Sequence, residues 1–239
     1  MNKDSILVGI IGLLLGLIVG FMFANGINQR GASGTVVAAQ QNGALPPDHP
    51  PINDAQAAPD MLAVQAAIDQ ARSEQDDFEA QMKAADYSYR VQRYDEAAKF
   101  LVRANQLQPD NYETIVRLGN VYYDAGRYEE AEKWYTAALQ KKSDDVNVRT
   151  DLGLTFMLRD PADLDRAIAE FRGSLERNPR HLQTLQNIAV AFTRKGDVGQ
   201  ARAFLAGLEE VSPGNPAIAS LRADIDKLQT QGAKAEVAR

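Results

Sequence analysis

The stretch "LGNVYYDAGRYEEAEKWYTAAL", residues 118–139, decides the fold. It places small residues at Gly119, Ala131 and Ala138 among larger apolar ones, with the spacing of two amphipathic helices. Gly126 lies where the first of these helices should end, since glycine readily closes a helix. The stretch therefore predicts a helical hairpin in which small residues let two helices cross closely.

This pattern recurs at a fixed period along the chain. The small residue at position 131 recurs at intervals of 34, 36 and 34, and an apolar residue follows four positions later each time. The small residues are Ala97, Ala131, Ala167 and Ala201, and the apolar ones are Leu101, Tyr135, Phe171 and Leu205. The pairs that mark each first helix are Ala84–Ala85, Leu118–Gly119, Leu152–Gly153 and Ile188–Ala189. Self-similarity of this kind is the signature of a repeat protein.

A single hairpin cannot bury its own apolar stripe, so neighbouring hairpins must stack. We therefore expect an all-α fold, a right-handed α-solenoid of about four helical hairpins with a concave inner surface. Pro109, Pro179 and Pro213 would close three of the units, and Ser143 takes that place in the second unit.

The second unit resembles the tetratricopeptide repeat (TPR) family, and the resemblance extends over residues 78–215. The matching residues are Leu118, Gly119, Tyr122, Gly126, Tyr128, Ala131, Tyr135 and Ala138. The expected units span residues 78–111, 112–145, 146–181 and 182–215. The third is two residues longer, in "LRDPADLDRA" at 158–167. There Asp160 is expected to cap the second helix, Pro161 to start it, and Asp163 to be an acid favoured by the helix dipole.

Helical stripes flank the repeats on both sides. A stripe that runs unbroken from Met61 to Tyr89 predicts either a coiled coil or a helix over 60–77 that packs on the array. We prefer the packed helix, because Gln75 and several alanines weaken the seam. After the repeats, the spacing of Ile218, Leu221, Ile225 and Leu228 predicts a capping helix over 216–229. Residues 230–239 have so few apolar side chains that we expect a disordered tail.

Residues 6–24, "ILVGIIGLLLGLIVGFMFA", follow a short tail at 1–5 and form a run of 19 uncharged residues. A helix of this length roughly matches the ~30 Å hydrocarbon core of a bilayer, so we expect a single transmembrane helix. The alternative is a cleaved signal peptide. Such peptides have apolar regions of about 7–15 residues, however, and no A-x-A motif follows immediately here.

The flanks of this segment indicate its orientation. Lys3 and the amino terminus on one side, against Arg30 alone on the other, favour a cytoplasmic N-terminus, and so a periplasmic repeat domain if the membrane is the inner membrane of a Gram-negative bacterium. Gly12, Gly16 and Gly20 recur every four residues and would suit a homodimer in the membrane, although glycine is also common in membrane helices. Residues 25–59, rich in Gly, Ala, Gln, Asn and Pro, predict a flexible linker.

Composition argues against several classes of protein. The net charge is −6 and no run of Lys and Arg exists, which disfavours a nucleic-acid binder. The chain has no cysteine and two histidines, His49 and His181, so we expect no disulfide and no metal site. No phosphate-binding loop and no nucleophile beside a histidine is recognisable, and we therefore expect no cofactor and no enzymatic activity.

The TPR resemblance implies a partner-binding groove lined by the first helix of each unit. The matching residues are Met82, Asp86, Tyr89, Arg90, Val116, Asn120, Tyr123, Asp124, Leu154, Met157, Val190, Thr193 and Arg194. Asn120 lies where carboxylate-clamp members carry an asparagine, but no groove position holds a lysine. An apolar or amphipathic helix is thus the expected ligand, in place of an acidic tail. The alternative is that several of these side chains contact neighbouring helices instead.

Three functions fit these features. The first is a membrane-tethered TPR adaptor that binds a protein segment in its groove for assembly of a complex at the membrane. The second is narrower: the layout is similar to that of TPR proteins of bacterial cytochrome c maturation, which would hold an apocytochrome. The third is a structural protein that self-associates through its membrane helix.

Overall fold

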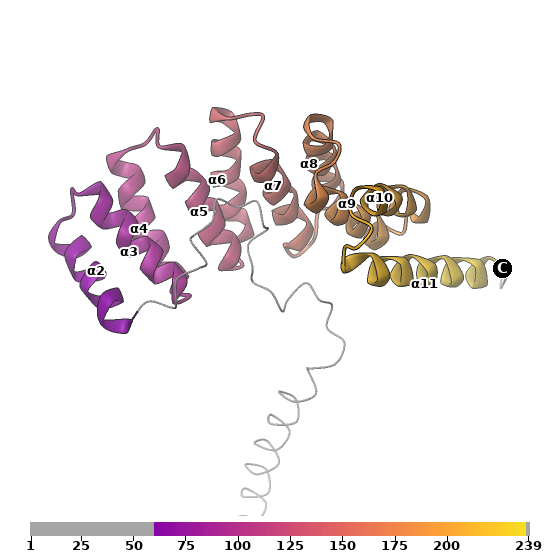
Figure 1. Ribbon diagram of the computed structural model, residues 1–239, viewed down its shortest axis with the longest axis horizontal. Helices are drawn as coiled ribbons and strands as arrows, with labels where there is room; N and C mark the ends of the chain where they lie inside the picture. Colours follow the sequence, from indigo (N-terminus) through magenta and orange to yellow (C-terminus); the bar gives the residue numbers. More distant parts are fainter. Residues whose placement is uncertain (1–59, 238–239) are drawn as a thin grey trace, which may run out of the picture. The chain divides into compact units, whose positions relative to one another are not determined.

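The structure is a computed structural model that describes residues 60–237, and ten α-helices account for most of this part of the chain (Figure 1). In order, they are α2 (Met61–Ser73), α3 (Phe78–Arg90), α4 (Tyr94–Leu107), α5 (Tyr112–Asp124), α6 (Tyr128–Lys141), α7 (Val146–Leu158), α8 (Leu164–Arg177), α9 (Leu182–Lys195), α10 (Val198–Val211) and α11 (Ala217–Val237). The expected tail at 1–5, membrane helix at 6–24, glycine stripe and linker at 25–59 lie outside the described residues.

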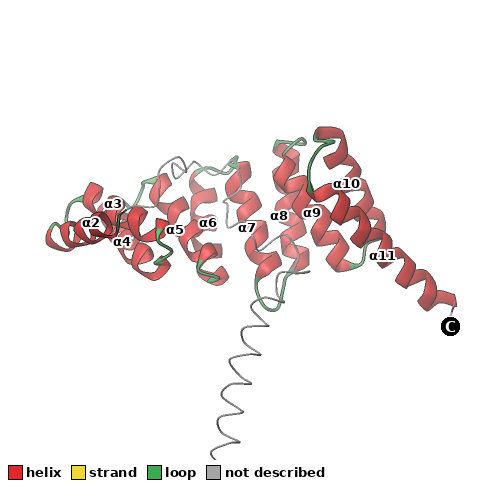
Figure 2. Cartoon of the chain, turned by 60° about the horizontal axis from the view of Figure 1, so that its bottom comes forward, coloured by secondary structure: helices red, strands yellow, loops and turns green. Residues whose placement is uncertain are grey.

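The helices pack in the order of the sequence. The pairs α3–α4, α5–α6, α7–α8 and α9–α10 make the closest associations, and each pair packs on the next through α4–α5, α6–α7 and α8–α9. Figures 1 and 2 show the same succession from two directions. Residues 60–237 contain no strand, so the predicted all-helical solenoid of paired helices is confirmed.

Local sequence explains where the helices begin and end. Asp77, Asn111 and Asp145 cap three of the first helices, each accepting a hydrogen bond from a backbone N–H three residues later at 3.0–3.1 Å. Gly126 and Gly196 have the positive φ angles, 72° and 84°, that close a helix and that side chains disfavour.

The turn of the longer third unit differs from the prediction. Asp163, and not Asp160, caps α8 by accepting a hydrogen bond from the Arg166 N–H at 3.1 Å. The second Asp163 oxygen accepts from Arg159 Nη2 at 2.9 Å. These two contacts hold Asp163 at the start of the helix and leave Pro161 in the turn, so the insertion lengthens the turn without breaking the pair.

The two helices of the central pairs cross at a glycine. A Cβ atom placed on Gly119 would lie 2.5 Å from the Tyr135 ring, and one on Gly153 would lie 2.5 Å from the Phe171 ring. Both rings are fully buried, at 0% exposure, and cannot move aside. In the outer units the equivalent residues are Ala85 with Leu101 and Ala189 with Leu205, all buried. An aromatic ring thus accompanies glycine, and leucine accompanies alanine.

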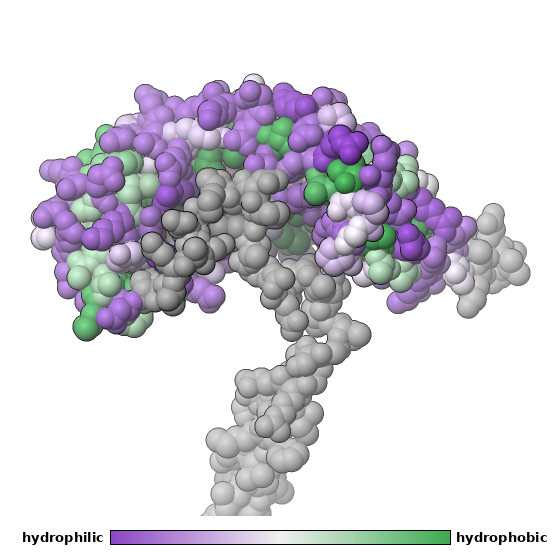
Figure 3. Space-filling model, viewed as in Figure 1, coloured by the Kyte–Doolittle hydropathy of each residue, from purple (hydrophilic) through white to green (hydrophobic). Residues whose placement is uncertain are grey.

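The apolar core runs through all of these helices. One group of buried residues extends from α2 to α5 and a second from α5 to α11. Helix α5 belongs to both, with Leu118 and Val121 in the first group and Ile115 and Val116 in the second. The surface is mostly hydrophilic, with hydrophobic residues showing at the α2 end and over the part that holds α8 to α10 (Figure 3).

The flanking helices complete this core at both ends. Helix α2 packs on α3 with Val64, Ile68 and Ala71 buried, and Gln81 Nε2 donates to the Ala71 carbonyl at 2.7 Å. Its apolar stripe is therefore used within the chain. None of the helices between residues 60 and 237 combines the length and the apolar content needed to cross a bilayer.

Helix α11 is longer than predicted. It continues to Val237, whereas the apolar pattern predicted an end at 229 and disorder from 230, and that prediction was wrong for residues 230–237. The packed residues Ile218, Leu221 and Ile225 provide the nucleus of the helix. Most of the residues that follow, among them Gln229, Gln231, Ala233, Lys234 and Glu236, are good helix formers, which favours continuation of the helix.

Substitution Gly153→Ala should lower the free energy of unfolding by about 1–3 kcal/mol, because the added methyl overlaps the immobile Phe171 ring. Phe171→Leu in the same chain should restore part of this loss, since it recreates the alanine and leucine combination of the outer units. Urea unfolding followed by circular dichroism measures both effects.

Gly199→Ala is the matched control for this pair. Gly199 lies in α10 with its nearest neighbour, Asp197 Oδ1, 3.6 Å from an added Cβ, so no loss is expected. Additive effects of Gly153→Ala and Phe171→Leu would contradict the proposed fit between the two residues.

Candidate partner-binding face

The first helices of the four pairs, α3, α5, α7 and α9, share one side of the array, which we call the inner face. Helices α7 and α9 contact each other directly although α8 lies between them in the sequence. Side chains also join successive first helices. The Thr150 and Thr184 hydroxyls lie 2.6 Å apart between α7 and α9, and the Tyr89 hydroxyl of α3 donates to Asp124 of α5.

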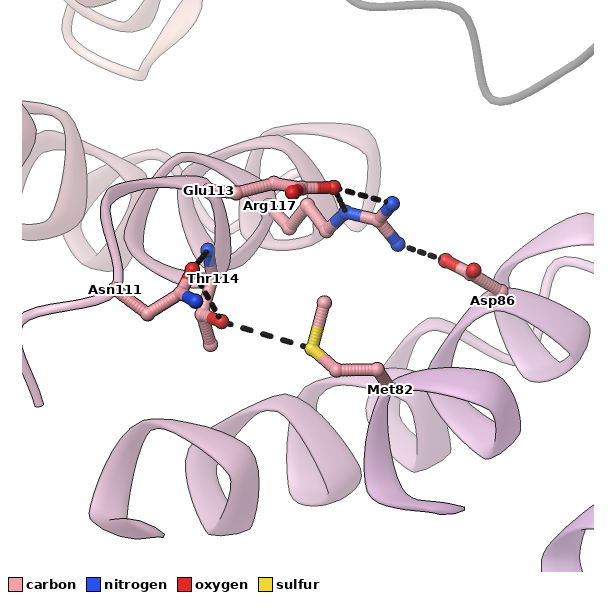
Figure 4. Close-up of polar contacts among 6 residues, drawn as sticks. All are labelled: Met82, Asp86, Asn111, Glu113, Thr114 and Arg117. Atoms are coloured by element: carbon pink, nitrogen blue, oxygen red, sulfur yellow. Dashed lines mark hydrogen bonds and ion pairs between the residues drawn. The ribbon is translucent and has the colours of Figure 1, made fainter. Parts of the chain in front are cut away.

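Arg117 is the main polar link between α3 and α5 (Figure 4). Its Nη2 and Nε lie 2.7 Å and 3.0 Å from Glu113 Oε1, and its Nη1 forms an ion pair with Asp86 across the helix boundary. Thr114 Oγ1 approaches Met82 Sδ at 3.6 Å on the buried side of the same contact. The guanidinium thus links the two helices where they border the inner face.

Five of the thirteen predicted groove residues are buried within the array: Met82, Val116, Asn120, Leu154 and Met157. The four apolar ones belong to the core, and Asn120 Oδ1 accepts a hydrogen bond from the Tyr135 hydroxyl at 2.9 Å. These side chains therefore hold neighbouring helices together, which is the alternative that their sequence positions left open.

The other eight predicted residues are half-buried or exposed: Asp86, Tyr89, Arg90, Tyr123, Asp124, Val190, Thr193 and Arg194. The Tyr89 and Tyr123 rings pack against the tyrosines that start α4 and α6, with ring centroids 5.6 Å and 5.7 Å apart. Arg194 Nη1 donates to the Met157 carbonyl at 2.7 Å. These residues give the inner face its accessible chemistry.

The character of the inner face changes along the array. The first two units present Asp86, Arg90 and Asp124 beside Glu113 and Arg117, a mixture of both charges. In the last two units the accessible residues include Val190 and Leu158, and Leu158 is 40% exposed. Leu158 occupies in the third unit the position that Asp124 occupies in the second. The face is therefore charged toward α3, and toward α9 it adds accessible apolar side chains beside Thr193 and Arg194.

A small pocket opens between α5 and α7. It has a volume of about 110 Å³. The lining residues are Tyr112, Glu113, Val116, Arg117, Asp145, Asn147, Val148 and Asp151. The sequence prediction included Val116 alone of these. Glu113 and Arg117 precede Asn120 by seven and three residues on the same helical stripe, so extending the stripe toward the start of α5 would have found them.

Burial shifts two ionisable groups on this face. It raises the pKa of the Asp86 carboxyl above its ordinary value of 3.8, and the attraction of Arg117 only partly reverses the effect. It also raises the pKa of the Tyr123 hydroxyl, with a further contribution from the nearby Asp151 carboxylate. Tyr123 is therefore a neutral hydrogen-bonding group over the physiological pH range.

Within residues 60–237, no three His, Asp or Glu side chains come close enough together to hold a metal ion. His181 lies at the start of α9, with its Nδ1 2.6 Å from Thr184 Oγ1. His181 is therefore part of a buried polar contact and has a structural role between the third and fourth units.

Comparisons with known proteins agree with this architecture. The family model described as Tetratricopeptide repeat matches residues 89–150 and 158–225, which together make up more than half of the chain. No curated protein matches the chain in sequence.

Solved structures share the fold at low sequence identity. YrrB, described as a TPR protein with an unusual peptide-binding site, is 18% identical over 67% of this chain and 81% of YrrB, with a TM-score of 0.59. MamA from Desulfovibrio magneticus RS-1, from residue 41 to its end, is 18% identical over 64% of this chain and 85% of its own, with a TM-score of 0.57. A further MamA structure is 17% identical over 63% and 81%, with a TM-score of 0.57.

Substitution Asp86→Asn should stabilise the chain at neutral pH. A carboxyl whose pKa is higher in the folded chain than in the unfolded one favours folding below the unfolded value of 3.8, and this contribution is lost as the pH rises through the folded value. The variant should therefore match the unsubstituted chain near pH 3.8 and exceed it increasingly toward neutral pH. Urea unfolding at a series of pH values measures the difference.

Asp224→Asn, on the exposed side of α11, controls for the removal of one negative charge. A lower stability of Asp86→Asn at neutral pH would mean that attraction to Arg117 outweighs burial, contrary to this account.

Proposed function

The chain belongs to the tetratricopeptide repeat family, and on this basis we propose that it is an adaptor, with no catalysis of its own, that binds a segment of a partner protein on the inner face. Tetratricopeptide repeats are in general protein-interaction modules, and YrrB, which shares the fold, is described as having a peptide-binding site. Repeat arrays of this kind use an extended surface, and not a deep cleft, for recognition.

One observation carries the proposal: the first helices expose side chains that the packing of the array does not need. Leu158 is 40% exposed at the end of α7, and Val190 is half-buried on α9. Covering such side chains with a partner contributes about 25 cal/mol for each Å² of apolar surface removed from water. Exposed apolar residues beside charged ones are the arrangement expected at a protein-binding surface.

The change in character along the face specifies the class of partner. An amphipathic helix would place its apolar stripe against Leu158 and Val190 and its charged residues near Arg90 and Asp124. Tyr123, half-buried between these two regions, offers a rigid aromatic surface of the kind that dominates binding energy at interfaces. The apocytochrome segment implied by the resemblance to cytochrome c maturation proteins is one helix of this class.

The proposal includes a membrane tether. The uncharged run at 6–24 is long enough to anchor the chain in the inner membrane, with the repeats on the periplasmic side. The linker at 25–59, about 35 residues long, would reach on the order of 30 Å as a flexible chain. The adaptor would thereby hold its partner close to the membrane, as a single copy or as a dimer joined through Gly12, Gly16 and Gly20.

Photo-crosslinking in intact membranes tests the inner face directly. A benzophenone amino acid in place of Val190 should crosslink to a partner protein, and the same group in place of the exposed Ala203 on α10 should not. Leu158→Glu should lower the Val190 crosslink about tenfold, the effect of ~1.4 kcal/mol, because a carboxylate replaces an apolar contact. Mass spectrometry of the adduct should identify an amphipathic helical segment.

Ala169→Glu on α8 adds the same charge to an exposed second-helix position and should leave the crosslink unchanged. Equal crosslinking from positions 190 and 203, or equal loss with both glutamate variants, would contradict binding on the inner face.

Deletion of residues 6–24 tests the tether separately. The full chain should remain with the membranes after washing with alkaline carbonate, and the shortened chain should move to the aqueous fraction. Recovery of the full chain in the aqueous fraction would overturn the membrane part of the proposal.

A further inference from the structure

We propose that the pocket between α5 and α7 receives a lysine or arginine side chain of the partner and so selects segments with a basic residue at that position. The inference rests on the proposed function, because the pocket lies in the inner face. It adds to that function a basic residue of the partner at one contact, which the apolar residues of the last two units do not specify.

The pocket is shaped for one long side chain. Tyr112, Glu113, Val116 and Arg117 form one stripe of α5, and Asn147, Val148 and Asp151 form the facing stripe of α7. Its volume of about 110 Å³ is well above the ~10–15 Å³ that a single water molecule needs. The Tyr112 ring and the Val116 and Val148 side chains give it apolar walls that would pack on methylene groups.

The charges around these walls favour a cation. The lining residues include three carboxylates, Glu113, Asp145 and Asp151, whereas Arg117 is the one cation among the eight described residues that line the pocket. Arg117 lies against Glu113, which leaves the negative charge concentrated near Asp145 and Asp151. Asp151 is only 3% exposed, and a charge in such surroundings interacts more strongly than it would in water.

An ammonium group of the chain itself lies over the ring of one lining residue. Lys142 Nζ is 4.5 Å from the centroid of the Tyr112 ring, within the range of a cation–π contact. The Tyr112 hydroxyl donates to Asp145 Oδ2 at 2.7 Å, so the ring and the carboxylate form one electron-rich surface. This contact within the chain shows the chemistry that a basic side chain of the partner would meet.

Other side chains of a partner would match either the apolar walls of the pocket or its charges, or neither, but not both. Leucine or methionine would suit the walls but would take water away from the half-buried Asp145 carboxylate without replacing it. Glutamate or aspartate would be repelled by the Asp145 and Asp151 carboxylates. Lysine and arginine combine an aliphatic stem with a cationic end, and so match the walls and the charges together.

Thiol modification of the full chain in membranes tests the pocket with small charged reagents in place of the partner. Because the chain has no cysteine, Asn147→Cys provides one reactive group at the pocket and Ala203→Cys provides one on α10. Each reacts with the cationic 2-aminoethyl and the anionic 2-sulfonatoethyl methanethiosulfonates, and the ratio of the two rates cancels the intrinsic reactivity of the thiol. The cation-to-anion ratio should be about tenfold higher at position 147 than at position 203.

Asp151→Asn in the Asn147→Cys chain should bring this ratio close to that of position 203, while an unchanged circular dichroism spectrum shows that the fold is kept. N-acetyl-lysine amide should slow the modification at position 147, and N-acetyl-norleucine amide, with the same stem and no charge, should not. Equal ratios at the two positions, no effect of Asp151→Asn, or equal protection by norleucine would each overturn the inference.

The outcome is separable from that of the crosslinking experiment. If the rate ratio is the same at positions 147 and 203 while the Val190 crosslink is still formed, the basic-residue pocket is excluded and the adaptor function stands. If Val190 forms no crosslink while the rate ratio at position 147 is high, the adaptor function is excluded. The assignment of a partner side chain to the pocket is then excluded as well.

Discussion

The close crossing of two helices at a glycine constrains the rest of the described structure. Gly119 under the Tyr135 ring and Gly153 under the Phe171 ring leave no space for even one methyl group. The two helices of each central pair therefore have a fixed separation, and the next pair must pack on the surface that this separation creates. This fixed separation also determines the direction in which the first helix of each central pair faces. The position of the inner face is thus a consequence of packing in the core.

The first helices serve both the core and the inner face, and neighbouring residues divide these tasks. Met157 is buried against the adjoining helices, whereas Leu158, the next residue, is 40% exposed. Asn120 holds the Tyr135 hydroxyl inside the array, and Tyr123, one turn later, is half-buried at the surface. A partner consequently meets side chains whose positions are set by buried neighbours. Such preorganisation lowers the entropy lost on binding.

The sequence predicted the fold well and the face less well, for physical reasons. A period of 34 residues with a small residue at each crossing has few structural solutions, so Ala97, Ala131, Ala167 and Ala201 were sufficient to predict paired helices. The same period gives the side of a helix on which Val116 and Leu154 lie, but not how deeply the neighbouring helix covers them. Arg117 and Asp151 escaped notice because their importance depends on Asp86 and on a pocket that two helices form together. Helix α11 extends further than expected because most residues after Leu228 have high helix propensity, which a prediction from apolar spacing does not register.

The central claim is that the array is a rigid frame whose first helices contact the partner. Hydrogen exchange of the full chain, measured with its crosslinked partner and again without it, tests this claim most directly. We predict slower exchange in α3, α5, α7 and α9 when the partner is present and no change in α4, α6, α8 and α10. Protection confined to these second helices, or to α11, would contradict it.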